Sequence, residues 1–229
     1  MPKKYGVKEK DLVVTYVVNL ILTGKLRSGD RLDRNEIAED LGISRVPIQE
    51  AVVQLEHDGI VSTQYHRGAF IHRFDVDVLR EHHELYGVLN GIASARAATE
   101  ADPELQTTLR ALAAGLRNSR DARSFHETAW QYREAVTDAH AGPRLQAAIR
   151  AAQTFIPRAY WSAYLDAPAA LLGHYEDETA AITDQDPDSA RAACAAAADL
   201  MGQIMATELV RRGVLEGPIA RDPFAFEMS

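Results

Sequence analysis

The sequence is poor in cysteine and has no long uninterrupted hydrophobic run. Its 229 residues include one cysteine, Cys194, which excludes an internal disulfide framework and a zinc site built from cysteines. The apolar run at Leu12–Leu22 is shorter than the ~20 residues that a membrane-spanning helix needs. The polar, charged start does not resemble a secretory signal. We therefore expect a soluble cytoplasmic protein with no membrane partner.

Motifs for nucleotide chemistry are also missing. The sequence has no Walker motif and no dinucleotide-binding glycine motif. His126, Glu127 and His140 do not form a recognisable nucleophile–base arrangement. Hydrophobic residues make up 46% of the chain, which is enough to bury a substantial core. We expect a folded protein that is not an enzyme and carries no cofactor.

The charge is distributed unevenly along the chain. The formal net charge is −8, yet residues 1–75 contain equal numbers of basic and acidic residues. All of the excess acid therefore lies in the C-terminal two thirds, which a phosphate backbone would repel. This asymmetry indicates two domains with different tasks.

Helix signals in the N-terminal third predict a winged helix-turn-helix. The apolar spacing in Leu12–Leu22 fits a helix that ends near Gly24, and Asp33 is placed to cap a short helix, "RNEIAEDL". Ser44 is placed to cap the next helix, which ends near His57. Two β-like runs then flank a turn at residues 65–68, as in a hairpin.

The stretch "GISRVPIQEAV" is the predicted DNA-reading segment. Pro47 would be the third helical residue, where its missing N–H costs little because first-turn donors have no partner within the helix. Arg45 would reach guanine acceptors, and Gln49 would pair with adenine through two hydrogen bonds. Arg34 is predicted to touch a phosphate, and the hairpin tip is predicted to act as the wing. The predicted DNA-contacting residues are Arg34, Ser44, Arg45, Gln49, His66, Arg67 and Gly68.

The rest of the chain reads as helix with short breaks. We expect six or seven helices between about Val76 and Leu215, with alanine-rich faces that permit close packing. The fold class is thus mainly α, with a winged helix-turn-helix and a small β-hairpin wing followed by an all-α bundle. The expected division is residues 1–75 for DNA binding, 76–215 for effector binding and dimerisation, and 216–229 as a tail.

Residues Ile21–Ile71, "ILTGKLRSGDRLDRNEIAEDLGISRVPIQEAVVQLEHDGIVSTQYHRGAFI", resemble the N-terminal domain of GntR-family bacterial transcription regulators. The acidic helical remainder resembles the FadR-type effector domain, called FCD, through "HELYGVLNGIASARAA" and "AHAGPRL". The resemblance implies a homodimer that binds a short palindromic operator and responds to a small-molecule effector, and we expect a repressor. It also implies DNA contacts by Arg34, Arg45, the Gln49 position and the Gly68 wing. Relatives usually carry arginine where this chain has Gln49, so we expect an altered operator at that step.

The resemblance implies a divalent metal in many FCD domains, held by an aspartate and three histidines. The first two positions correspond here to Ala129 and Arg133, which cannot bind a metal. The third falls at His174 or Tyr175, and the fourth at Ala197 or Asp199. We therefore expect no metal in this place. Arg133 either offers a positive charge to an anionic ligand or forms a structural salt bridge.

The effector itself is expected to be apolar or anionic. Tyr86 and Asn90 stand where relatives usually carry charged residues, and several aromatic residues follow later in the chain. If these face one cavity, the ligand is larger and more apolar than a small hydroxy acid. They could equally form core or dimer surface. The predicted effector-binding residues are Tyr86, Asn90, Trp130, Arg133, Arg158, His174 and Tyr175, whereas the adjacent His82 and His83 are expected at the surface or at a domain contact.

Two other functions stay open on the sequence. One is a constitutive DNA-binding regulator with a vestigial pocket. The other is a helical ligand-binding or enzymatic protein whose DNA-binding head is degenerate.

Overall fold

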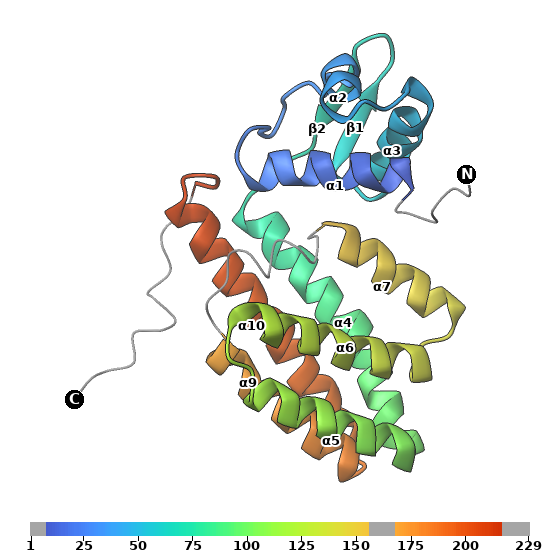
Figure 1. The fold of residues 1–229 in the computed structure, drawn as a ribbon, viewed down its shortest axis with the longest axis vertical. Coiled ribbons are helices and arrows are strands. Elements are labelled where there is room, and N and C mark those ends of the chain that lie inside the picture. The colour runs from blue at the N-terminus through green and yellow to red at the C-terminus, as the bar shows by residue number, and fades with distance from the viewer. Residues whose placement is uncertain (1–7, 156–167, 217–229) are drawn as a thin grey trace, which may run out of the picture.

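The computed structural model describes residues 8–155 and 168–216. Figure 1 shows a small winged part at one end and a helical bundle at the other, with α1 of the winged part facing the bundle near α7. The mainly α fold class is confirmed. The elements in chain order are α1 (Glu9–Leu22), α2 (Arg34–Leu41), α3 (Arg45–His57), β1 (Val61–Gln64), β2 (Gly68–Ile71), α4 (Val76–Glu100), α5 (Pro103–Arg117), α6 (Ala122–His140), α7 (Pro143–Phe155), α9 (Pro168–Thr183) and α10 (Pro187–Arg211).

The winged part follows its local sequence signals closely. The carboxylate of Asp33 accepts hydrogen bonds from the backbone N–H groups of Asn35 and Glu36, which caps α2 as predicted. Gly42 ends α2 in the left-handed conformation, with φ of 63°. Pro47 is the third residue of α3, also as predicted. One detail of the prediction was wrong: Ser44 precedes α3 at the N-cap position, but its side chain makes no capping hydrogen bond.

The hairpin forms a two-stranded antiparallel sheet. Val61 pairs with Ile71 and Gln64 with Gly68, so the turn lies at the predicted place. The segment before α2 adds an isolated bridge between Arg31 and Phe70. The core beneath the sheet is formed by buried aliphatic side chains from α1, α2, α3 and both strands, among them Val13, Val17, Ile37, Ile48, Val52, Leu55, Val61 and Ile71.

Six helices are described after residue 75, in agreement with the prediction. The longest two, α4 and α10, lie side by side through the bundle and contact each other extensively. A Cβ atom at Gly87 would lie 3.0 Å from the Cβ of Ala198, so these helices approach more closely than a larger residue would permit. Asp186 caps α10 with Pro187 at its start, also as predicted. The division into domains at residues 75 and 215 stays a prediction.

Within the described residues, α10 is long and apolar enough to cross a membrane by length and composition alone. The buried helix of a soluble protein passes the same test, so this observation is weak. Helix α10 packs against α4 and α9 in the bundle.

Candidate functional site

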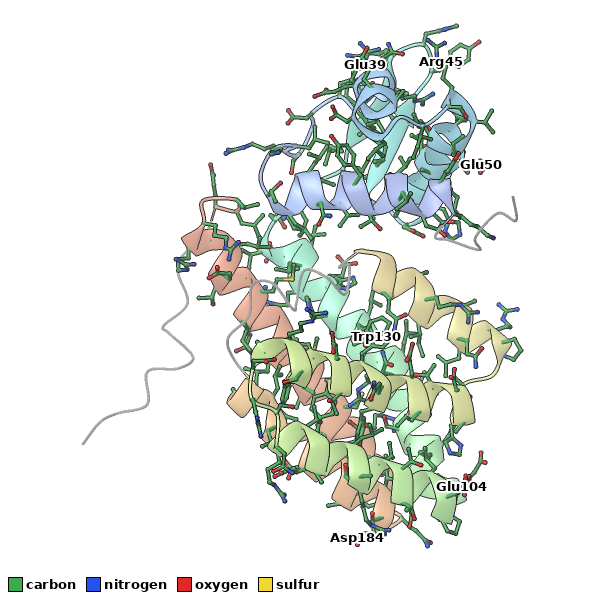
Figure 2. All side chains as sticks on the ribbon, in the orientation of Figure 1. Glu39, Arg45, Glu50, Glu104, Trp130 and Asp184 are labelled. Carbon is green, nitrogen blue, oxygen red and sulfur yellow. The ribbon has the colours of Figure 1, made fainter. Side chains whose placement is uncertain are left out.

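The first turn of α3 lies at the outer end of the winged part. Figure 2 shows Arg45 projecting there, on the side away from the helical bundle. Arg45 and Gln49 are exposed and one helical turn apart, so they share one face of α3. The residues predicted from sequence to read DNA are thus brought together on an accessible surface.

Two hydrogen bonds tie this face of α3 to the start of α2. Arg34 Nη1 donates to Gln49 Oε1 at 2.6 Å. Arg45 Nη2 donates to Asn35 Oδ1 at 3.4 Å. Asn35 was not predicted from the sequence, because an asparagine after a helix cap has no pattern that distinguishes it from other surface residues. The four side chains line a surface hollow of about 590 Å³ together with Arg31, Leu32, Asp33, Ile48, Gly68 and Ala69.

The hairpin tip provides the predicted wing. His66 and Arg67 are exposed, and His66 adopts a left-handed backbone conformation with φ of 59°. Gly68 has φ of 102°, and a Cβ there would lie 3.3 Å from the Nε atom of Arg31. The positive φ therefore favours glycine at this position, and a larger residue would also displace the Arg31 side chain slightly. Arg31 is a further cation at this surface, which was not predicted from the sequence.

A cavity lies within the helical bundle, enclosed mainly by α4, α6 and α9. Its volume is about 60 Å³, enough for a few water molecules or one small chemical group. Four of the predicted effector-binding residues, Tyr86, Trp130, Arg133 and Tyr175, line it, and Figure 2 marks Trp130 on α6. The other lining residues are His82, His83, Phe125, His126, Ala129, Gln153, Leu171 and Met201.

Of the predicted effector-binding residues that the structure describes, two, Asn90 and His174, are not among the lining side chains. Asn90 is buried in α4, where its Nδ2 donates to the carbonyl oxygen of Tyr86 at 2.9 Å. Its Oδ1 has no hydrogen-bond partner among the described residues. His174 is half-buried on α9 outside the cavity, and Arg158 lies outside the described residues.

Arg133 forms a buried ion pair with Glu178. Its guanidinium makes two contacts with the carboxylate, of which Nη1 to Oε1 is 2.8 Å, and both side chains are almost fully shielded from solvent. Ser94 Oγ donates to the same carboxylate oxygen at 2.6 Å, and Arg133 Nη1 lies 3.1 Å from Cys194 Sγ. Of the two sequence-based readings of Arg133, the structural salt bridge is therefore the one present. Glu178 was missed, because a glutamate in a helix ordinarily faces solvent.

Two neighbouring aromatic rings, whose centroids are 5.2 Å apart, contact the Arg133 guanidinium. Its central carbon lies 5.2 Å from the ring centroid of Tyr132 and 5.1 Å from that of Tyr175. Burial is the largest influence on the tyrosine hydroxyl of Tyr175 and raises its pKa, so the group stays neutral. The thiol of Cys194 is likewise buried, which raises its pKa to about 12 and keeps it in the protonated form.

His83 lies in the interior of the bundle, whereas the sequence predicted a place at the surface or at a domain contact. Its Nδ1 is 2.8 Å from the carbonyl oxygen of Leu79, and its ring packs against Gly202 of α10. Burial lowers the pKa of His83 to about 4 and that of His82 to about 3, so both rings are neutral near pH 7. His82 is half-buried and also lines a groove between the winged part and the bundle, which agrees with its predicted place at a domain contact.

The residues at the positions of the FCD metal ligands do not fit a divalent ion. Ala129 has no donor atom, and Arg133 is a cation that already donates to Glu178. The described residues contain no cluster of three or more histidine, cysteine, aspartate or glutamate side chains that could hold a metal. The expectation of a metal-free helical domain stays a prediction.

Replacement of Glu178 tests the buried ion pair. We expect Glu178→Gln to lower the free energy of unfolding by ~3–5 kcal/mol, because it leaves the buried Arg133 charge without its counter-ion. Glu176→Gln is the matched control on the same helix, since Glu176 pairs with Arg117 at the surface and should contribute less than ~1 kcal/mol. Urea unfolding measures both variants. Similar small effects in the two would contradict the structural role of the pair.

The neutral interior histidines predict a pH dependence of stability. Burial lowers the pKa of His83 from its ordinary value of 6.5 to about 4 in the folded protein, so the unfolded chain binds the proton first. Stability from this group is therefore full above pH 6.5 and falls as the pH drops toward 4, by up to ~1.4 kcal/mol per pH unit. We expect His83→Gln to flatten the urea-derived stability profile between pH 6.5 and 5, whereas the control His66→Gln, at the exposed wing, leaves it unchanged. If stability changed equally with pH in the unaltered protein, His83→Gln and His66→Gln, His83 would not be the source of the pH dependence.

Known proteins match this chain both in amino-acid sequence and in three-dimensional structure. The family model for bacterial regulatory proteins of the gntR family matches residues 10–71. An uncharacterized HTH-type transcriptional regulator of Mycobacterium tuberculosis (strain H37Rv) is 60% identical over 226 residues, which span 99% of this chain and 93% of that protein. A Streptomyces ambofaciens regulator of the same description is 33% identical over 97 residues, spanning 40% of this chain and 39% of its own.

Solved structures share the overall architecture. E. coli McbR/YncC superimposes with a TM-score of 0.59 at 21% identity, over 87% of this chain and 98% of its own. A transcriptional regulator of the GntR family from Pseudomonas syringae pv. tomato gives a TM-score of 0.53 at 15% identity, over 90% and 87%. At such identities the likeness concerns the fold alone. Together with the extended identity to the mycobacterial regulator, the winged helix-turn-helix establishes that this chain belongs to the GntR family of DNA-binding transcriptional regulators.

Proposed function

We propose that this chain is a ligand-responsive repressor that binds a short palindromic operator as a homodimer in the cytoplasm. In this proposal α3 enters the major groove, the hairpin follows the backbone, and the bundle is an FCD-type effector domain. The observation that carries the proposal is the accessible face of α3, where Arg45 and Gln49 are exposed at the outer end of the molecule. A recognition helix uses its first turns for base contacts, and these two residues lie in those turns.

The distribution of charge supports an orientation in which the winged part faces DNA. Arg31, Arg34 and Arg45 gather around the hollow at the start of α2 and α3, whereas the excess acid of the chain lies after residue 75. A phosphate backbone is attracted to the first surface and repelled by the second, so the winged part would meet DNA with the bundle held away.

We propose an uncharged, mainly apolar effector for the cavity. Among its described lining residues, Arg133 is already neutralised by Glu178, and His82 and His83 are neutral because burial lowers the pKa of each ring. The aromatic and aliphatic lining of the cavity favours an apolar ligand, and the side chain of Gln153, which is hydrogen-bonded to Tyr86, adds a polar group to the wall. An anion would have to compete with Glu178 for Arg133, which disfavours the anionic alternative.

Widening of the cavity is the step that would link the effector to DNA. Effector pockets are commonly ~300–1,000 Å³, whereas this cavity holds about 60 Å³. A ligand larger than a few waters would therefore have to separate the walls or extend through the open side of the cavity. His82 faces both the cavity and the groove against the winged part, so its displacement would reach His72 and Arg73 across that groove. A ligand with different affinity for the two arrangements would then change DNA affinity.

The same small volume favours a second candidate, a constitutive regulator whose pocket is vestigial. A thermal-shift screen of uncharged and anionic metabolites separates the two candidates. Stabilisation by an uncharged compound that also alters DNA affinity supports the effector proposal. A screen without any stabilising compound favours constitutive binding.

Binding to DNA can be tested with the gene's own upstream region. We expect purified full-length protein to retard this fragment at moderate salt, in the presence of excess unrelated DNA, with the stoichiometry of a dimer per site. Footprinting then locates the operator and shows whether it is palindromic. Equal retardation of unrelated DNA would contradict specific binding.

Arg45→Ala tests the reading role of α3 directly. We expect it to lower operator affinity by ~1–3 kcal/mol and to relax the preference at one base pair of each half-site, since a guanine contact would be lost. Arg80→Ala, an exposed arginine on α4 paired with Asp77, is the control and should leave DNA affinity unchanged. Affinity titrations on single-substituted operators measure both effects. Unchanged site preference in Arg45→Ala would mean that Arg45 does not read bases.

A further inference from the structure

The pairing of Arg34 with Gln49 has a consequence for the base that Gln49 can read. Arg34 Nη1 lies 2.6 Å from Gln49 Oε1, and this bond joins the first residue of α2 to the second turn of α3. We propose that Arg34 is a positioning residue that fixes the Gln49 amide, so that Gln49 reads guanine rather than adenine. This inference rests on the proposal that α3 is the reading helix.

The chemistry of the two groups fixes the orientation of the amide. A guanidinium has donors and no acceptor, so the amide atom that faces it must be the oxygen. A charge-assisted bond of this kind is stronger than one between neutral groups. Gln49 therefore turns its acceptor toward α2, and its Nε2 makes no hydrogen bond within the described part of the chain.

Base recognition requires a different set of atoms for each purine. Two-point recognition of adenine needs the amide oxygen to accept from N6 while the amide nitrogen donates to N7. With the oxygen held by Arg34, Gln49 offers the two hydrogens of Nε2. Guanine presents two acceptors in the major groove, O6 and N7, and so matches a pure donor. The glutamine would then select the base expected of the arginine that relatives usually carry, which contradicts the altered operator expected from the sequence.

Arg45 and Asn35 form a second hydrogen bond between α3 and α2. Asn35 Oδ1 accepts from Arg45 Nη2 at 3.4 Å, so consecutive residues of α2 hold the two reading side chains of α3. The Asp33 cap fixes this end of α2, because its carboxylate binds the backbone N–H of Asn35 and of Glu36. Arg34 and Asn35 thus stand on an anchored turn, which restricts the rotamers of Gln49 and Arg45 before DNA arrives.

Selection from a random duplex library tests the proposal with purified full-length protein. Gln49→Ala identifies the base pair that Gln49 reads, as the position whose preference disappears. At that position we expect the unaltered protein to favour guanine over adenine by roughly tenfold, the scale of one good base contact. Arg34→Ala should shift the preference there toward adenine, since the amide oxygen becomes available. Gel-shift titrations on the paired guanine and adenine sites give the ratio.

Arg67→Ala is the matched control, because it removes a cation from the exposed wing that does not contact Gln49. We expect it to weaken both sites equally and to leave the ratio unchanged. If Arg34 only contacts a phosphate, Arg34→Ala will also weaken the guanine and adenine sites equally. The affinity ratio of the two sites would stay unaltered and the salt dependence of binding would fall, and this result would overturn the proposal. A preference for adenine in the unaltered protein would overturn it as well. If Gln49→Ala left the base preference unchanged at every operator position, Gln49 would not read a base. The proposal that α3 reads DNA through Gln49, on which this inference rests, would then be wrong.

Discussion

The buried ion pair between Arg133 and Glu178 is the interaction on which the helical part depends. Either charge alone would cost several kcal/mol in this interior, so each requires the other. Arg133 comes from α6 and Glu178 from α9, while Ser94 of α4 and Cys194 of α10 complete the contacts. One polar cluster thus joins four helices whose remaining contacts are largely apolar. Directional bonds of this kind specify how the helices are placed relative to one another, which apolar packing leaves less strictly defined.

The same pair determines what the cavity can hold. A free guanidinium beside Tyr132 and Tyr175 would attract carboxylates, but Glu178 already supplies the negative charge. The neighbouring histidines are kept neutral by burial, which lowers the pKa of both. The electrostatic character of the cavity is therefore fixed by contacts behind its surface. The winged part is similar in this respect. Arg34 and Asn35 of α2 hydrogen-bond Gln49 and Arg45, the side chains of α3 that would contact DNA.

Local signals allowed much of the fold to be predicted. The bounds of α2 and α3 follow from Asp33, Gly42 and Pro47, each of which acts within a few residues of its own position. The cap of α10 by Asp186 is equally local. Of the six predicted effector-binding residues that the structure describes, four line the cavity. The errors concern side chains rather than elements: Ser44 makes no cap bond, and His83 is buried in the bundle instead of lying at the surface or at a domain contact.

The sequence by itself determined the winged helix-turn-helix and the helical remainder, because caps, turns and apolar periodicity are encoded over short distances, and it indicated the family through the resemblance of residues Ile21–Ile71. Only the tertiary structure decided the state of the functional side chains. Arg133 and Glu178 are 45 positions apart, and Arg34 and Gln49 are 15 apart, so no local pattern announces either pair. Whether an arginine is free or neutralised, and which end of an amide is available, depends on which side chain another helix brings within 3 Å. That geometry is set by packing of the whole chain and therefore appears only once the helices are assembled.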